Sequence, residues 1–190
     1  MSDVPEADAV SAHTRRWIER VVVGLELCPF AAPVLRGEQL RIAVCEATEL
    51  TELASALLDE LDLLQRTPEA ELATSVLVMP RALADFDDYL DFLSLAEELL
   101  AECGLEGTLQ IASFHPDYCF DGVPADDVAN FTNRSPYPML HFLREAQIER
   151  ALQRYPDPER IPQRNIEHLR GLGKSQMIAL LDAIAAPDRQ

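Results

Sequence analysis

The sequence predicts an α/β fold with a small, largely parallel sheet of three or four strands flanked by helices. Three strand-like runs, at residues 40–45, 74–79 and 108–113, alternate with longer segments whose apolar residues recur at helical spacing. The second run is apolar on both faces, as in a strand covered by helices on both sides. The main alternative is a ferredoxin-like α+β arrangement, because three strands alone make a thin sheet.

The remaining elements complete this pattern. A first helix is expected from Ser11 to about Leu25, where Ser11 is a good helix cap. Later helices are expected at about 48–65, 82–103, 138–154 and 158–170, followed by a short tail helix that ends near Ala185. The leucines of the second helix should face inward: Leu53, Leu57, Leu61 and Leu64. A short strand near Pro33 to Leu35 would add an edge to the sheet.

The chain is long enough for one domain and contains no linker rich in glycine or serine. We therefore expect a single domain over residues 1–190. Within it, residues 1–10 are expected to be disordered, residues 11–135 to form an α/β core with an aromatic loop, and residues 136–186 to form C-terminal helices.

Charge limits the partners. Lysine and arginine number 16 against 33 aspartates and glutamates, a net charge of −17. Such a surface repels phosphodiester backbones and anionic lipids, so we expect neither nucleic acid nor a membrane as partner. Residues 46–106 hold sixteen acids and two arginines, whereas residues 134–170 hold seven arginines and five acids. Two interpretations fit this distribution: the C-terminal segment faces an anionic ligand, or the acidic residues form solvated helix faces.

The N-terminus is acidic and lacks the features of a secretory signal, and no apolar run reaches the roughly 18 residues of a membrane span. We therefore expect a cytoplasmic protein. Its four cysteines, none in a C-x-x-C pair, are expected to be free thiols. The sequence indicates no particular cofactor.

Four short motifs stand out: TRRWIE at 14–19, GLELCPFA at 24–31, SFHPDY at 113–118 and NRSPYPMLH at 133–141. From about Thr14 to about Leu172, the chain resembles the domain of unknown function 1415 family of bacterial proteins. The resemblance implies a bacterial cytoplasmic setting, and it brings no activity, cofactor or catalytic residue. The family has a longer amide side chain where this chain has Cys119, so that thiol receives no role from the resemblance.

Residues 114–142 contain six of the twelve aromatic residues and two of the four histidines. In open α/β sheets ligands bind beyond the carboxyl ends of the strands, and His115 directly follows the third strand. His115 and Asp117 could act as a general-base pair, with His141 as a further catalytic residue. We assign no metal site; a required divalent metal would be held by His115, Asp117 and His141, with Asn130 nearby. The alternative is a histidine packed into the loop.

A second site is expected at the start of the helix predicted near Pro138. Either Ser135 caps that helix with Pro136 as its first residue, or Tyr137 and Pro138 open it one turn later. In both cases the free backbone N–H groups at the helix start would attract an anion. Arg134 would then pair with a carboxylate or phosphate, or else tie the loop to an acidic side chain elsewhere. Further candidate ligand-binding residues come from the same motifs: Asn130, Asn133, Tyr118, Tyr137, Arg15 and Cys28.

Cys28 has two possible local geometries. If Pro29 begins a short helix, Cys28 becomes its N-cap and the helix dipole favours the thiolate. If Cys28 instead lies in the turn that ends the first helix, it is a buried and unreactive thiol, which we favour because apolar residues surround it.

Two functions fit these observations. The first is a hydrolase or lyase that acts on a small anionic substrate, in a cleft lined by Cys28–Phe30, His115–Tyr118 and Asn133–His141. The alternative is a protein that binds a small ligand or a partner in the same aromatic cleft without catalysis.

Overall fold

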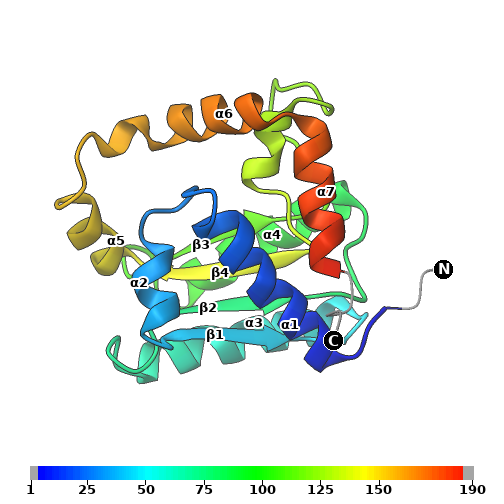
Figure 1. Cartoon of the computed structure of the whole chain (residues 1–190). Coiled ribbons are helices and arrows are strands. Elements are labelled where there is room, and N and C mark those ends of the chain that lie inside the picture. Colours follow the sequence, from blue (N-terminus) through cyan, green and yellow to red (C-terminus); the bar gives the residue numbers. More distant parts are fainter. Residues whose placement is uncertain (1–3, 186–190) are drawn as a thin grey trace.

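The computed structural model describes residues 4–185 (Figure 1). Its four-stranded sheet consists of β1 (Leu40–Val44), β2 (Thr74–Val78), β3 (Leu109–Phe114) and β4 (Met139–Arg144), in the order β1-β2-β4-β3. The strands β1 and β2 are parallel, and β4 is antiparallel to both of its neighbours. The fold has helices and a mixed sheet, so the expectation of a largely parallel sheet is wrong. The reason is that β4 inserts between β2 and β3.

The fourth strand replaces half of a predicted helix. A helix was expected from Pro138 to Arg154, but only α5 (Glu145–Leu152) is helical there. The residues of β4 are mostly apolar on both faces because helices and loops cover both faces of the sheet. Such a run cannot be distinguished from a buried helix by its periodicity.

Two N-terminal predictions also need correction. The short edge strand expected near Pro33 is instead the helix α2 (Ala31–Arg36). The first helix, α1 (Ala7–Trp17), begins before Ser11, so residues 7–10 are not disordered, and it continues as a π-helix over Ile18–Val23. Residues 1–3 lie outside the described part of the chain.

The order of the elements also differs from the β-α-β-β-α-β order of a ferredoxin-like fold.

Two helices cover one face of the sheet. These are α3 (Leu50–Arg66) and α4 (Phe86–Glu102), which lie behind the sheet in Figure 1. The inward stripe predicted for α3 is confirmed, since all four leucines are buried. The main members of this core are Leu53, Leu57, Leu61, Leu64, Leu77, Tyr89, Phe92, Leu140 and Phe142.

The other face is covered by α1, the π-helix and α7 (Lys174–Ala185). Trp17, Val21 and Met177 pack there against Val76 and Met139 of the sheet. Burial of this kind contributes roughly 1.5–3 kcal/mol for each large apolar side chain. No helix within residues 4–185 is long and apolar enough to cross a bilayer.

The chain reaches α7 through an arch formed by α5, the short 3-10 helix Pro158–Arg160 and α6 (Ile161–Leu172). In Figure 1 this arch runs across the top of the molecule, and the connection between α5 and α6 lies at its left edge. Side-chain contacts hold α6 to earlier segments. The Asn165 side chain donates to the Leu27 carbonyl oxygen at 2.7 Å, and Arg170 forms an ion pair of 2.7 Å with Asp127.

Candidate functional site

His115 is fully buried at the end of β3. Its Nε2 lies 2.9 Å from the Leu83 carbonyl oxygen and therefore carries the proton, which leaves Nδ1 to accept from the Asp117 backbone N–H at 3.0 Å. Burial lowers the pKa of the imidazole. Both ring nitrogens of this neutral histidine have backbone partners, while the Asp117 side chain is exposed. This geometry favours the alternative of a packed histidine over a general-base pair.

Tyr89 of α4 holds the strand ends beside His115. Its hydroxyl donates to the Met139 carbonyl oxygen at 2.9 Å and accepts from the Phe114 backbone N–H at 2.9 Å. The Tyr89 hydroxyl thus bridges the ends of β4 and β3, where direct strand pairing would otherwise continue. Burial raises the pKa of this hydroxyl. The Tyr89 ring lies 5.1 Å from that of His115. Tyr89 and His115 together join the sheet to α4.

His141 lies on the opposite face of the sheet. Phe114 packs edge-on against Trp17 of α1. Because successive side chains of a strand point to opposite faces, the next residue, His115, points to the other face, towards α4. The Nε2 of His141 is 2.7 Å from the Thr74 hydroxyl oxygen. Because that hydroxyl donates its proton to the Phe142 carbonyl oxygen, Nε2–H must be the donor. Burial lowers the pKa of His141 to about 4.

The sheet therefore separates the two histidines, and the structure does not bring His115, Asp117 and His141 into one cluster. Within residues 4–185, no group of three or more histidine, cysteine or acidic side chains could hold a metal ion. The three-residue metal arrangement considered above is thus not formed.

Arg134 precedes a strand, so the helix start expected to bind an anion beside it does not exist. Its guanidinium donates to the carbonyl oxygens of Tyr118 at 3.1 Å and Ala125 at 2.8 Å, and it stacks over the Phe131 ring at 4.8 Å. Arg134 does tie the loop together, although through backbone carbonyls and not through an acidic side chain.

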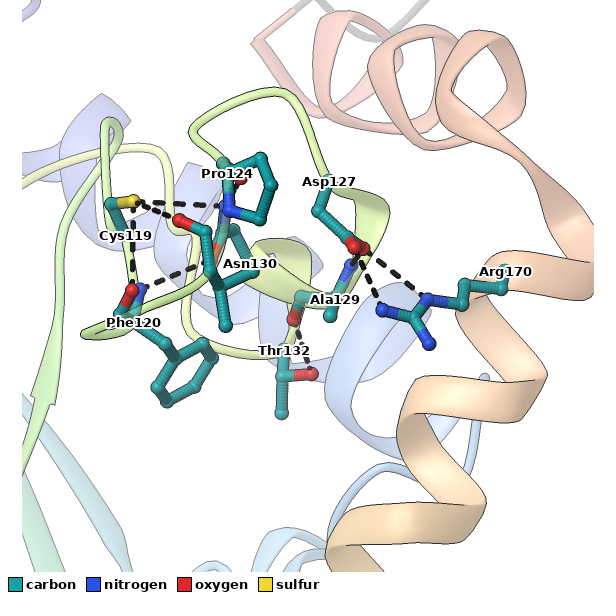
Figure 2. Close-up of polar contacts among 9 residues, drawn as sticks. Cys119, Phe120, Pro124, Asp127, Ala129, Asn130, Thr132 and Arg170 are labelled. Carbon is teal, nitrogen blue, oxygen red and sulfur yellow. Dashed lines mark hydrogen bonds and ion pairs between the residues drawn. The ribbon is translucent and has the colours of Figure 1, made fainter.

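The other polar residues of this segment also bond to nearby backbone, as Figure 2 shows for Asn130. Its amide accepts from the Phe120 N–H at 3.0 Å and donates to the Pro124 carbonyl oxygen at 2.9 Å. Asn133 donates to the Ser113 carbonyl oxygen at 3.0 Å, and Ser135 to that of Tyr137 at 2.7 Å. These bonds keep an aromatic loop with little regular structure in one conformation.

Figure 2 also shows how this loop is attached to α6. Asp127 accepts from the Ala129 N–H at 2.8 Å and thereby caps the short 3-10 helix Val128–Thr132. The hydrogen bond from Arg170 lowers the pKa of the Asp127 carboxyl. The Cys119 thiol donates to the Val123 carbonyl oxygen at 3.3 Å.

Tyr137 contacts a residue that the sequence analysis did not single out. Its hydroxyl lies 2.8 Å from Nδ1 of His13 in α1, and the two rings are stacked at 6.2 Å. Burial raises the pKa of Tyr137, and the charge of Arg16 partly offsets this effect. The pair joins α1, next to the first motif, to the last motif. Elsewhere, the Tyr118 hydroxyl is 3.2 Å from that of Ser113, and Arg15 is exposed on α1.

Cys28 lies in the turn between the π-helix and α2. The N-cap of α2 is Phe30, so the N-cap geometry considered for Cys28 is wrong. Backbone N–H groups of Phe30 and Ala31 favour the thiolate, but burial outweighs them and raises the pKa of the thiol. Cys28 therefore lies in the turn, as expected, but it is only partly buried, and its low reactivity stays a prediction.

A pocket of about 310 Å³ lies outside these motifs, at the connection between α5 and α6. We call it the α5–α6 pocket. It is lined by Tyr155, Pro156, Asp157, Arg160, Ile161, Gln163, Arg164 and Glu167. Arg164 and Glu167 are three residues apart on one face of α6, and Arg160, the N-cap of α6, precedes Arg164 by four residues. Its volume falls at the lower end of small-molecule sites, which span about 300–1,000 Å³.

The pocket is attached to the Cys28–Phe30 segment. Arg164 donates to the Tyr155 hydroxyl and, at 3.3 Å, to the Glu26 carbonyl oxygen. The guanidinium of Arg164 also lies over the Tyr155 ring, whose other neighbour is the Phe30 ring at 5.9 Å. Arg164 is therefore already oriented at the pocket wall.

Comparison with known proteins decides the family. The sequence pattern described as protein of unknown function (DUF1415) matches residues 9–179. The chain belongs to the DUF1415 family. No curated protein matches it, and no solved structure does.

In this DUF1415 protein the sequence analysis did not find the pocket residues, because most of them are exposed polar or charged residues of ordinary types. A usable signal was the excess of arginine over acids in residues 134–170. The Pro156-Asp157-Pro158 sequence, which favours a chain reversal, was a second one.

Proposed function

We propose that this protein binds a small anionic molecule in the α5–α6 pocket, as a binding protein without a catalytic step of its own. The observation that carries the proposal is the pocket of about 310 Å³ with two arginines and a tyrosine in its wall. A planar guanidinium offers paired donors to a carboxylate or phosphate.

Charge supports this location. The chain carries a net charge of −17, so an anion is repelled by most of the surface. Within the described residues, the Arg160 side chain has no hydrogen-bond or ion-pair partner in the protein, which leaves its donors available to a ligand. The Arg164 guanidinium is held in place by Tyr155 and Glu26, so little side-chain entropy is lost when it binds.

The geometry of the aromatic loop favours binding over catalysis. The nitrogens of His115 are bonded to backbone, and His141 lies across the sheet from it. A hydrolase or lyase needs an acid or base within reach of the substrate. The catalytic roles predicted for His115, Asp117 and His141 stay predictions, and the proposal does not depend on them.

Calorimetric titration with sodium pentanoate and with inorganic phosphate tests the proposal. Charge-assisted hydrogen bonds contribute roughly 1.5–3 kcal/mol, so Arg160→Ala should weaken binding by about tenfold or more. Arg66→Ala is the matched control, because Arg66 is an exposed helical arginine paired with Asp62 on α3. Equal affinity in the Arg160→Ala variant, or loss of binding only in Arg134→Ala, would show that the anion binds elsewhere.

A further inference from the structure

The α5–α6 pocket also contains two carboxylates, which an anion-binding site does not require. Asp157 and Glu167 line the same wall as Arg160 and Arg164, so the formal charges of the lining cancel. A ligand with only negative charge would be attracted by the arginines and repelled by the acids. The composition of the pocket therefore calls for a ligand with both charges.

The four charges do not neutralise one another directly. Among the described residues, neither Asp157 nor Glu167 forms an ion pair with either guanidinium of the pocket. The Oε1 atom of Glu167 accepts from the Gln163 amide at 2.8 Å, which orients the carboxylate. Both signs of charge are thus available to a bound molecule.

The backbone also fixes the position of Asp157. This residue has a φ of 50°, in the left-handed region, and Pro158 follows it. Aspartate and asparagine adopt this conformation more readily than most residues. The Tyr155 ring and Ile161 provide apolar surface for a carbon skeleton between the charged groups.

We propose that the ligand of the α5–α6 pocket is a small zwitterion of the amino-acid class. Its carboxylate binds Arg160 and Arg164, and its ammonium group binds Asp157 and Glu167. An ammonium group has three donors and no acceptor, which matches two carboxylates. This inference rests on the proposed function, since it assumes that the pocket binds the anionic end.

Four probes of equal carbon number test it by calorimetric titration: pentanoate, pentylamine, 2-aminopentanoate and 5-aminopentanoate. The two amino acids differ in how far the ammonium lies from the carboxylate. We expect at least one of them to bind roughly tenfold more tightly than pentanoate, the effect of one added charge-assisted contact. Pentylamine should bind weakly, because it lacks the group that the arginines hold.

Each of the variants Glu167→Gln and Asp157→Asn should change the affinity for the amino acids and the affinity for pentanoate in opposite directions. Each should weaken the preferred amino acid by about tenfold and tighten pentanoate, because a repelling carboxylate has gone. Both substitutions preserve the local backbone, as glutamine still accepts from Gln163 and asparagine tolerates positive φ. Asp62→Asn, at an exposed carboxylate on α3, is the control.

The outcomes separate the two proposals. If pentanoate and both amino acids bind equally and all depend on Arg160, the pocket binds anions and the zwitterion inference is wrong. If no probe binds, or binding is insensitive to Arg160→Ala, the proposed function itself fails. If the amino acids bind more tightly but Glu167→Gln and Asp157→Asn leave this preference unchanged, the ammonium lies elsewhere and the inference is overturned.

Discussion

The indole nitrogen of Trp17 donates a hydrogen bond of 3.1 Å to the carbonyl oxygen of Arg134, 117 residues further along the chain. Trp17 belongs to the first of the four motifs and Arg134 to the last. The Trp17 ring also packs edge-on against Phe114, at the end of β3, with ring centroids 5.2 Å apart. One side chain thus joins α1 to both ends of the aromatic loop.

Trp17→Phe should lower the free energy of unfolding by about 1–3 kcal/mol, because the Arg134 carbonyl loses its donor and the smaller ring fills less space. Urea denaturation followed by far-ultraviolet circular dichroism measures the change, since the variant has lost the only tryptophan. Unchanged stability would mean that the bond to Arg134 does not hold the loop.

Arg144 connects β4 to the end of α3. Its Nη2 atom lies 2.7 Å from the carbonyl oxygens of Leu64 and Thr67, and 3.1 Å from that of Leu72. Arg144→Lys should cost about 1.5–3 kcal/mol, because a lysine ammonium cannot reproduce the fork of the guanidinium. Arg66→Lys, at an exposed pair, should change the stability by less than about 0.5 kcal/mol. Equal effects of the two substitutions in urea denaturation would contradict the role of Arg144.

His141 makes stability depend on pH. Its pKa is about 4 in the folded protein and rises to the ordinary value of about 6.5 on unfolding. The unfolded state then binds the extra proton between these values, so stability falls as the pH drops from about 6.5 towards 4, by at most about 1.4 kcal/mol per pH unit.

The comparison of wild type with His141→Gln isolates this effect. His115, whose pKa burial also lowers, and the carboxylates titrate alike in both proteins and cancel. Urea denaturation at several pH values should show a shallower fall in the variant. Parallel curves would indicate that His141 is protonated in the folded state at these pH values.

Cysteine reactivity follows burial. Cys103 is exposed after α4, whereas Cys28 is partly buried with a raised pKa. Alkylation near neutral pH, followed by mass spectrometry, should modify Cys103 first and Cys28 much more slowly, because only the thiolate reacts. Urea should remove the difference. Faster modification of Cys28 in the native protein would show that a nearby group activates its thiol.

The sequence predicted the elements whose periodicity has one interpretation. The leucines of α3 recur at helical spacing and are buried. The strand predicted at β2 is also correct, and all five of its residues are buried in the middle of the sheet. The run of β4 has no single interpretation, since both faces of the sheet are covered and its residues are therefore mostly apolar on both sides. That ambiguity hid the mixed sheet and led to the anion site expected at a helix start.

The candidate site was harder to predict than the fold. The aromatic loop was expected to supply the ligand-binding side chains, but its polar residues such as Asn130 and Arg134 bond to its own backbone. The pocket arises where a chain reversal brings Tyr155 beside Arg164. In the sequence, such exposed charged residues look like any solvated helix face.

The most direct test of ligand binding in the α5–α6 pocket is a nuclear magnetic resonance titration of the ¹⁵N-labelled protein with 5-aminopentanoate. We expect saturable shifts of the backbone amides of residues 155–167 and of the Arg160 and Arg164 side-chain Nε–H signals. Smaller shifts should appear at residues 26–30, through the contacts of Arg164 with Glu26 and of Tyr155 with Phe30. Shifts centred on residues 115–141, or a spectrum that does not change, would contradict the assignment of the pocket as the ligand site.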